Sequence, residues 1–241
     1  MRIPTIRGVI DRRILLNYRV SPEAIARHLP KPFRPKLVRG HAVAGICLIR
    51  LRGLRPKSLP FSLGATSENA AHRIAVEWRD ERGRHEGVYI PRRDTNSRLN
   101  AMAGGRIFPG VHHHARFEVD ENQGHFCIRV QSDDGATHID IDAHVEHVFP
   151  SESIFRSLDE VSEFFERGSL GYSATARNDQ FDGLELKCTE WKVTPMVVDR
   201  VASSFFDDPI QFPLGSVEFD HALLMRGIDH EWIGHGRSRL A

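Results

Sequence analysis

The alternation of apolar and polar residues is clearest between residues 115 and 149. The stretches ARFEV, HFCIRV and THIDIDAHVEHV each alternate, and the turn-forming runs DENQG and SDDG separate them. This pattern predicts an antiparallel three-stranded meander with one buried face. The last stretch has five polar residues on one face, which we expect to face solvent: His138, Asp140, Asp142, His144 and Glu146.

Further strands are predicted on both sides of this region. RILLNYRV and HAVAGICLIRLRGL are apolar runs with β-branched residues. RIAVEW (73–78) and GVYI (87–90) flank the polar segment RDERGRHE, which is typical of a hairpin. The last third, from LELKCTEWKVTPMVV to SSFFDDPIQFPLGSVEFDHALLM, returns to strands and loops. Strands therefore dominate the prediction.

Three short segments are predicted to be helical: SPEAIARHLP, TNSRLNAMAGGR and SLDEVSEFFERG. Ser21 and Ser157 are suitable N-caps for the first and the third. Thr95 or Asn96 would cap the second, and Gly104–Gly105 would end it. With no repeat and no linker-like tract, residues 1–241 are expected to form one mainly β (α+β) domain with a few short peripheral helices.

Composition narrows the classes of function. The 241 residues are 40% hydrophobic and 27% charged, and the formal net charge is only +1. Such a balance does not indicate binding to nucleic acid or to an anionic membrane. No run approaches the roughly 18 apolar residues that span a bilayer, and the N-terminal segment does not resemble a secretion signal. Three widely spaced cysteines suit a reducing compartment, so we expect a cytoplasmic protein.

Candidate chemistry gathers in GRIFPGVHHHARFE. On a strand, His112 and His114 share one face and His113 points to the other. A same-face pair of histidines can chelate a metal, but the sequence does not identify the further ligands, and half-buried histidines are the competing interpretation. Glu68, in the polar start of GATSENAAHRIAV, is either a general acid or base or an exposed loop residue. Motifs for dinucleotides, phosphates or a nucleophilic serine do not occur, so no cofactor is expected.

Several segments together resemble the acetoacetate decarboxylase-like superfamily. YRVSPEAIARHLPKPF resembles its early strand–helix signature, and AGGRIFPGVHHHARF resembles its active-site stretch. GATSENAAHRIAV is similar to the segment that carries the catalytic glutamate, and TEWKVTP and FPLGSVEFDHALLM are similar to the closing strands. The chain most resembles the YqjF-like, or DUF2071, branch. This resemblance implies an antiparallel barrel or cone around an apolar pocket, and a homo-oligomer.

The resemblance also implies roles for individual residues, but no lysine occupies the position of the imine-forming lysine. The decarboxylases form an imine on a lysine, and that lysine aligns here with His113 and its lysine neighbour with His114. Imidazole has no primary amine and cannot form an imine. Glu68 matches the family's glutamate. The substrate-orienting arginine falls at Arg12 or Arg13.

The matched motif supplies two more residues and completes the hypothesis. Arg106 matches its arginine, and His112 is expected beside the substrate. We therefore predict Glu/His acid–base chemistry, by Glu68 with His113 and His114, on a small oxo or enol compound that can carry a carboxylate. The activity would be that of a lyase or isomerase. Two alternatives stay open: a non-catalytic protein that binds a small apolar acid, and a metal-dependent lyase or hydrolase built on His112 and His114.

Overall fold

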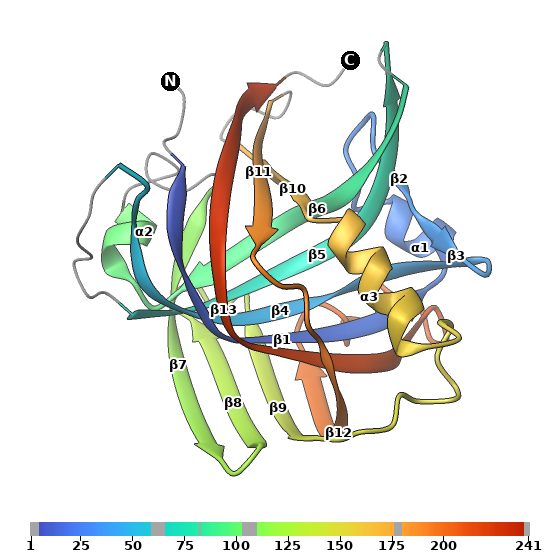
Figure 1. The fold of residues 1–241 in the computed structure, drawn as a ribbon. Coiled ribbons are helices and arrows are strands. Elements are labelled where there is room, and N and C mark those ends of the chain that lie inside the picture. The colour runs from blue at the N-terminus through green and yellow to red at the C-terminus, as the bar shows by residue number, and fades with distance from the viewer. Residues whose placement is uncertain (1–4, 59–65, 82, 103–109, 176–179, 239–241) are drawn as a thin grey trace.

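The fold is seen in a computed structural model that describes residues 5–58, 66–81, 83–102, 110–175 and 180–238. Its strands are β1 (Ile6–Val20), β2 (Arg34–Pro35), β3 (Leu37–Val38), β4 (His41–Pro56), β5 (Thr66–Asp80), β6 (Gly83–Thr95), β7 (His112–Asn122), β8 (His125–Ser132), β9 (His138–Val145), β10 (Leu170–Ala174), β11 (Phe181–Cys188), β12 (Thr194–Ser203) and β13 (Val217–Ser238). Its helices are α1 (Pro22–Ala26), α2 (Arg98–Met102) and α3 (Leu158–Arg167). Figure 1 shows the strands as one strongly curled sheet.

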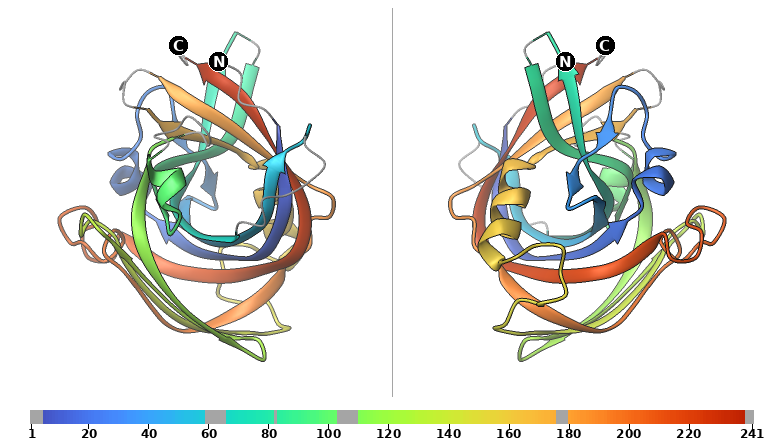
Figure 2. Two further views of the ribbon diagram at one scale, coloured as in Figure 1. Left: turned by 90° about the vertical axis from the view of Figure 1, so that its left-hand side faces the viewer. Right: turned by 90° about the vertical axis from the view of Figure 1, so that its right-hand side faces the viewer.

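The strand pairings close into two rings that share five strands. One circuit runs β6–β7–β8–β9–β12–β13–β1–β4–β5 and back to β6; we call it the large ring. The other runs β11–β10–β6–β5–β4–β1–β13 and back to β11; we call it the small ring. Figure 2 shows the strands curling into rings, with β7, β8, β9 and β12 bent away below. Strands β1, β4, β5, β6 and β13 thus have a different ring on each face.

Each face of the shared strands packs against its own core. Leu16 belongs to the core that joins β1, β4 and β5 to Phe126 and Ile141 of the meander, and so lies on the large-ring face. Its neighbour Leu15 points the other way, into a second core with Phe165 of α3. Shared strands buried on both faces have few positions left for polar residues, which explains the long apolar runs in the sequence.

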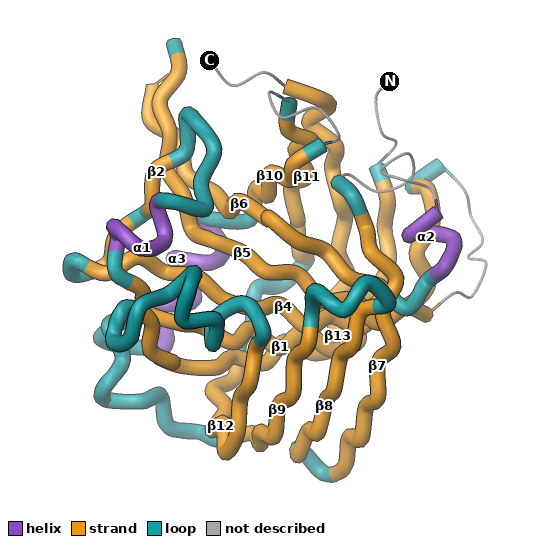
Figure 3. The backbone as a smooth tube through the Cα atoms, turned by 180° about the vertical axis from the view of Figure 1, so that it is seen from behind, coloured by secondary structure: helices purple, strands orange, loops and turns teal. Residues whose placement is uncertain are grey.

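The mainly β prediction is confirmed, and so are most of its elements. The meander is β7–β8–β9, with antiparallel pairing and one buried face. The predicted solvent face of β9 is exposed or half-buried. The hairpin is β5–β6 (Figure 3), and Ser21 and Ser157 cap α1 and α3 by accepting hydrogen bonds from backbone N–H groups. With its caps Ser157 and Gly168, α3 spans the whole predicted segment, whereas α1 and α2 are shorter than predicted.

Two details differ from the prediction. The sheet is not antiparallel throughout, because β6 pairs in parallel with both β7 and β10. The chain between β6 and β7 contains α2, and such a crossover is what parallel neighbours require. In α2 the capping side chain is Ser97, whose Oγ accepts a hydrogen bond from the N–H of Asn100 at 3.3 Å, rather than Thr95 or Asn96. Gly104–Gly105 lie outside the described residues. No helix in the described ranges is long and apolar enough to cross a membrane.

Candidate functional site

The small ring encloses a cavity of about 120 Å³. All seven strands of the ring contribute to its wall, and Phe165 at the end of α3 contributes from outside the ring. Most of the lining is apolar or small: Cys47, Ile49, Leu51, Leu54, Ala70, Ala71, Val88, Ile90, Phe165, Gly168, Gly171, Leu184, Leu186 and Trp232. Small residues such as Ala71 at the middle of a β-strand leave the space that larger side chains would fill. The cavity is therefore a consequence of residue size within a closed ring.

Three arginines interrupt this apolar wall: Arg13, Arg73 and Arg93. Arg13 donates weak hydrogen bonds to two sulfur atoms, Cys47 Sγ at 3.4 Å and Met225 Sδ at 3.6 Å. Arg93 donates from Nε to Ser173 Oγ at 2.9 Å. Among the described residues these hydrogen-bond partners are neutral, and the carboxylate that also lines the cavity, Asp94, is paired with Arg92 at 2.8 Å.

Arg73 is the most buried of the three. It donates a hydrogen bond to Asn17 Oδ1, and its guanidinium carbon lies 4.5 Å from the ring centre of Phe165. Burial lowers the pKa of Arg73 to about 9 and that of Arg93 to about 10, so both stay protonated at neutral pH. Within the described ranges, none of these arginines forms an ion pair with a carboxylate. A buried cation without a counter-ion is costly, so the cavity favours an anion.

His112 supplies the imidazole of the cavity. It lies directly across from Arg93 in the β6–β7 pairing, and its Nδ1 donates to the carbonyl of Gly110 at 3.3 Å. A carbonyl can only accept a hydrogen bond, so the neutral ring carries its basic lone pair on Nε2. Burial, followed by the charge of Arg93, lowers the pKa of His112 to about 3. The imidazole is therefore neutral at physiological pH and next to a guanidinium.

A β-bulge in β1 decides which of the two predicted arginines reaches the cavity. The pairing register of β1 shifts between Ile10 and Arg12. After the shift, Arg13 points into the small ring and lines the cavity, whereas Arg12 points into the large ring and is fully buried. Only Arg13 of this pair is thus placed where it can orient a substrate in the cavity.

Glu68 lies with Arg12 rather than in the cavity lining. Its Oε2 accepts from Arg12 Nη2 at 2.5 Å and its Oε1 accepts from Arg50 Nε at 2.5 Å. Glu121 continues the ion-pair network by accepting from Arg12 at 3.4 Å, from Arg50 at 3.1 Å and from Arg226. Glu68 therefore compensates buried positive charge on the large-ring side, although its neighbour Asn69 lines the cavity.

The predicted histidines, His112, His113 and His114, do not all belong to the cavity lining. His113 pairs with Asp134 at 3.1 Å and His114 with Asp133 at 2.7 Å, and neither belongs to the cavity lining. The structure therefore does not gather Glu68, His113 and His114 around one cavity, and their catalytic roles stay predictions. Arg106 lies outside the described residues. His112 lines the cavity, as its predicted contact with substrate requires.

The sequence profile of the DUF2071 family, described as an uncharacterised conserved protein, matches residues 10–218. The chain belongs to the DUF2071 family. Comparison with curated proteins gives no match. The matched span contains each described residue of the cavity lining except Trp232.

Solved structures show that this DUF2071 chain has the acetoacetate decarboxylase-like fold. An acetoacetate decarboxylase from Legionella pneumophila shares 12% identity, with a TM-score of 0.61, over 99% of this chain and 88% of that one. An acetoacetate decarboxylase-like enzyme from Sphingomonas wittichii RW1 shares 9% identity, with a TM-score of 0.62, over 100% and 94%. The enduracididine biosynthesis enzyme MppR in complex with pyruvate shares 10% identity, with a TM-score of 0.62, over 100% and 91%. The predicted resemblance is confirmed for the fold.

Arg73 and Arg93 of this DUF2071 chain were not predicted as site residues. Arg73 lies in the mostly apolar strand segment AAHRIAV, whereas Arg93 is flanked by the charged residues Arg92 and Asp94 in VYIPRRD. A charged side chain in an otherwise buried strand is uncommon, and that signal could have identified Arg73 but not Arg93. Arg73 and Arg93 line the same cavity because β5 and β6 both belong to the small ring. The alternation of apolar and polar residues in the sequence does not reveal that arrangement.

Proposed function

We propose that the protein is an enzyme that binds a small oxo or enol carboxylate in the small ring and moves a proton with His112, without an imine intermediate. The observation that carries the proposal is the combination of three guanidiniums, which form no ion pair with a carboxylate of the described residues, and one neutral imidazole on a mostly apolar cavity wall. The carboxylate of Asp94 also lines the cavity, but it is paired with Arg92. The relation to the acetoacetate decarboxylase-like fold supports a small-molecule substrate but supplies no reaction by itself.

The arginines account for recognition of the anion. Arg13 lies close enough to Arg73 for its charge to lower the pKa of Arg73, whereas Arg93 lies beside His112. A carboxylate held by the first two would accept charge-assisted hydrogen bonds from groups that are already desolvated. Arg93 would then be next to the carbonyl oxygen of the same molecule, where negative charge develops when an enolate forms.

His112 accounts for proton transfer. Nε2 takes a proton from the carbon next to the substrate carbonyl, the C–H electron pair moves into the carbon–carbon bond, and the oxygen becomes an enolate stabilised by Arg93. Return of the proton to carbon completes an exchange or isomerisation, and loss of a β-substituent instead would give a lyase reaction. A bound carboxylate adds negative charge to the cavity and so raises the pKa of His112 towards a useful range.

An imine is not supported by the positions of the lysines. All five, Lys31, Lys36, Lys57, Lys187 and Lys192, lie in the described ranges, and none is in the cavity lining. Lys36, for example, pairs with Glu86 at 2.6 Å and lies over the ring of Phe164. We therefore expect borohydride to trap no covalent adduct with acetoacetate.

One observation favours the second candidate, a binding protein. A histidine with a pKa of about 3 is a weak base, so the cavity of the free protein is better prepared to hold an anion than to remove a proton. The two functions share the arginines and differ only in what His112 does after binding. The metal-dependent alternative stays a prediction; in the described ranges the group of three side chains arranged to hold a metal does not include His112 or His114.

Binding is expected to depend on charge in the cavity. Pyruvate, acetoacetate and oxaloacetate should raise the melting temperature of the protein, whereas their methyl esters should not. Arg93→Gln should weaken the binding of the preferred acid at least ten-fold in calorimetric titration, because it removes a charge-assisted contact. Arg116→Gln, a change at an exposed position of β7, is the matched control. Equal affinities for acids and esters would contradict the anion site.

Catalysis is expected to depend on His112. With an acid that binds, solvent deuterium should enter the carbon next to the carbonyl, which proton NMR follows directly. His112→Gln should reduce the rate about 100-fold or more while changing the affinity only a few-fold. Binding without deuterium exchange or turnover in the parent protein would favour the binding protein. Unchanged exchange in His112→Gln would show that His112 is not the base.

A further inference from the structure

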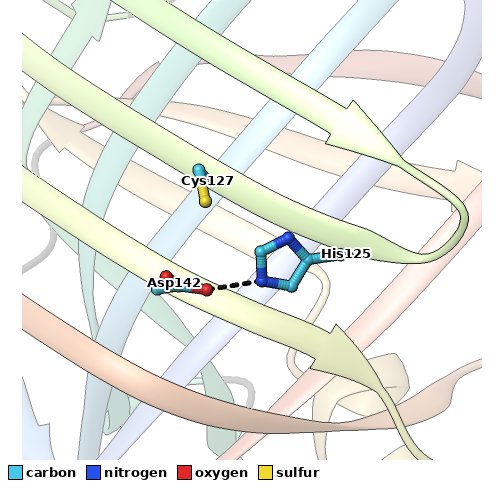
Figure 4. Close-up of side chains that lie close together, drawn as sticks. All are labelled: His125, Cys127 and Asp142. Atoms are coloured by element: carbon cyan, nitrogen blue, oxygen red, sulfur yellow. Dashed lines mark hydrogen bonds and ion pairs between the residues drawn. The ribbon is translucent and has the colours of Figure 1, made fainter.

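A second group of chemically reactive side chains lies on the outer face of the meander, away from the cavity. His125 and Cys127 come from β8 and Asp142 from β9 (Figure 4). Cys127 is directly opposite Asp142 in the antiparallel pairing, and His125 is two residues before Cys127 and so on the same face. One nitrogen, one sulfur and one oxygen atom lie within 4.8 Å of one another.

These three groups form a donor set that suits zinc. Thiolate, imidazole and carboxylate all bind Zn²⁺, at about 2.0–2.3 Å and in tetrahedral geometry, which separates neighbouring ligand atoms by roughly 3.3–3.8 Å. The observed separations need only small side-chain rotations to reach those values. In the structure Nε2 of His125 donates a hydrogen bond to Oδ1 of Asp142 at 2.6 Å, so two of the three candidate ligand atoms already face each other. Three protein ligands leave a fourth position for water.

The local charges favour a cation at this place. Asp140, on the same face of β9, is neutralised by Arg200 at 2.6 Å and by Arg129 at 3.4 Å. Asp142 instead pairs with His125, and Asp120 of β7 lies opposite Cys127 in the pairing and has no hydrogen bond or ion pair with the described residues. Two carboxylates therefore lie on either side of the thiol, and the nearby Arg200, whose charge also acts on Asp142 and Cys127, makes its ion pair with Asp140.

The thiol responds to these charges. Desolvation, followed by the charges of Asp142 and Asp120 and a hydrogen bond to Asp142, raises the pKa of the Cys127 thiol, and the charge of Arg200 opposes part of this rise. A divalent cation bound there would reverse this effect, because it favours the thiolate and draws the carboxylates towards itself. The alternative is an ordinary surface His–Asp ion pair beside a cysteine that takes no part.

The geometry points to a zinc site formed by His125, Cys127 and Asp142, with Asp120 next to it, on the outer face of the meander. This site is independent of the function proposed for the cavity. The strand register creates it, since ligands from two strands meet where neighbouring positions of a single strand would be too far apart.

Cobalt titration tests this site directly. Protein made without a histidine tag and stripped with a chelator should bind one equivalent of Co²⁺ with a thiolate-to-cobalt charge-transfer band, and Zn²⁺ should displace the Co²⁺ and abolish the band. Cys127→Ser should remove the band, and Asp142→Asn should weaken Zn²⁺ at least ten-fold in competition with a chromophoric chelator. Cys47 is buried and Cys188 partly buried elsewhere, so neither should supply the thiolate.

Two variants on the same face act as matched controls. Asp140→Asn and His144→Ala change neighbouring polar groups that already have partners, Arg200 and Asp199, and should leave the Zn²⁺ affinity within about two-fold. Circular dichroism of each variant checks folding. The absence of the band at one equivalent of Co²⁺, its persistence in Cys127→Ser, or equal losses in Asp142→Asn and Asp140→Asn would each overturn the assignment.

Discussion

Replacing Glu68 with glutamine is expected to lower the free energy of unfolding by about 3–5 kcal/mol, the usual effect of removing one partner from a buried ion pair. Arg12 is fully buried, and Glu68 accepts hydrogen bonds from both Arg12 and Arg50 at 2.5 Å. Glutamine has nearly the same shape but no charge, so the Arg12 guanidinium would lose its main counter-ion away from water. Urea denaturation at neutral pH measures the loss.

Two comparisons make this result specific. Glu118→Gln changes an exposed carboxylate of β7 with no partner in the described ranges, and it should cost less than about 0.5 kcal/mol. In an Arg12→Met background, Glu68→Gln should cost much less than in the parent protein, because the charge that it compensates is gone. A Glu68→Gln protein as stable as the parent that has lost turnover would instead support the predicted catalytic role.

Lowering the pH is expected to destabilise the protein, and the loss of stability should begin at a pH above the range in which carboxylates titrate. Burial, followed by the charge of Arg92, lowers the pKa of His72 to about 4, and burial, followed by the charge of Arg13, lowers that of His230 to about 4. In the unfolded chain both have a pKa near 6.5. Between pH 6.5 and pH 4 the unfolded chain therefore binds protons that the folded chain does not.

The free energy of unfolding should accordingly fall as the pH falls through this interval, and His72 alone accounts for on the order of 3 kcal/mol at its lower end. His72→Leu should flatten the curve by about that amount and be more stable than the parent protein near pH 4.5. His147→Leu, a change at an exposed histidine, is the matched control. Chemical denaturation at a series of pH values measures both curves, and parallel curves for His72→Leu and the parent would contradict the prediction.

Local patterns were sufficient for most of the strands and caps. Alternation in the meander follows from the two-residue period of a strand, and Ser157 caps α3 because a side-chain oxygen can satisfy a free N–H group at a helix start. These features depend on residues within a few positions of one another, so a single sequence contains the information. The parallel pairs of β6 were missed because pairing partners depend on where the chain returns.

The candidate site was only partly predictable, and β1 shows why. Sequence similarity narrowed the substrate-orienting arginine to Arg12 or Arg13, and the choice between them depended on one residue of register. The bulge before Arg12 sends the two side chains into different rings, where Arg12 compensates Glu68 and Arg13 lines the cavity. A shift of one residue reverses the face of every following side chain, and the sequence contains no local sign of it.

The sequence by itself determined the mainly β class and the acetoacetate decarboxylase-like resemblance, because these depend on residue identity and short-range order. Only the tertiary structure decided that Arg13, Arg73, Arg93 and His112 share one cavity while Glu68 lies in an ion-pair network on the other side of the sheet. Closing the strands into two rings brings together residues that are far apart in the chain. Which of them meet depends on strand register and ring closure, and both arise from packing across the whole molecule.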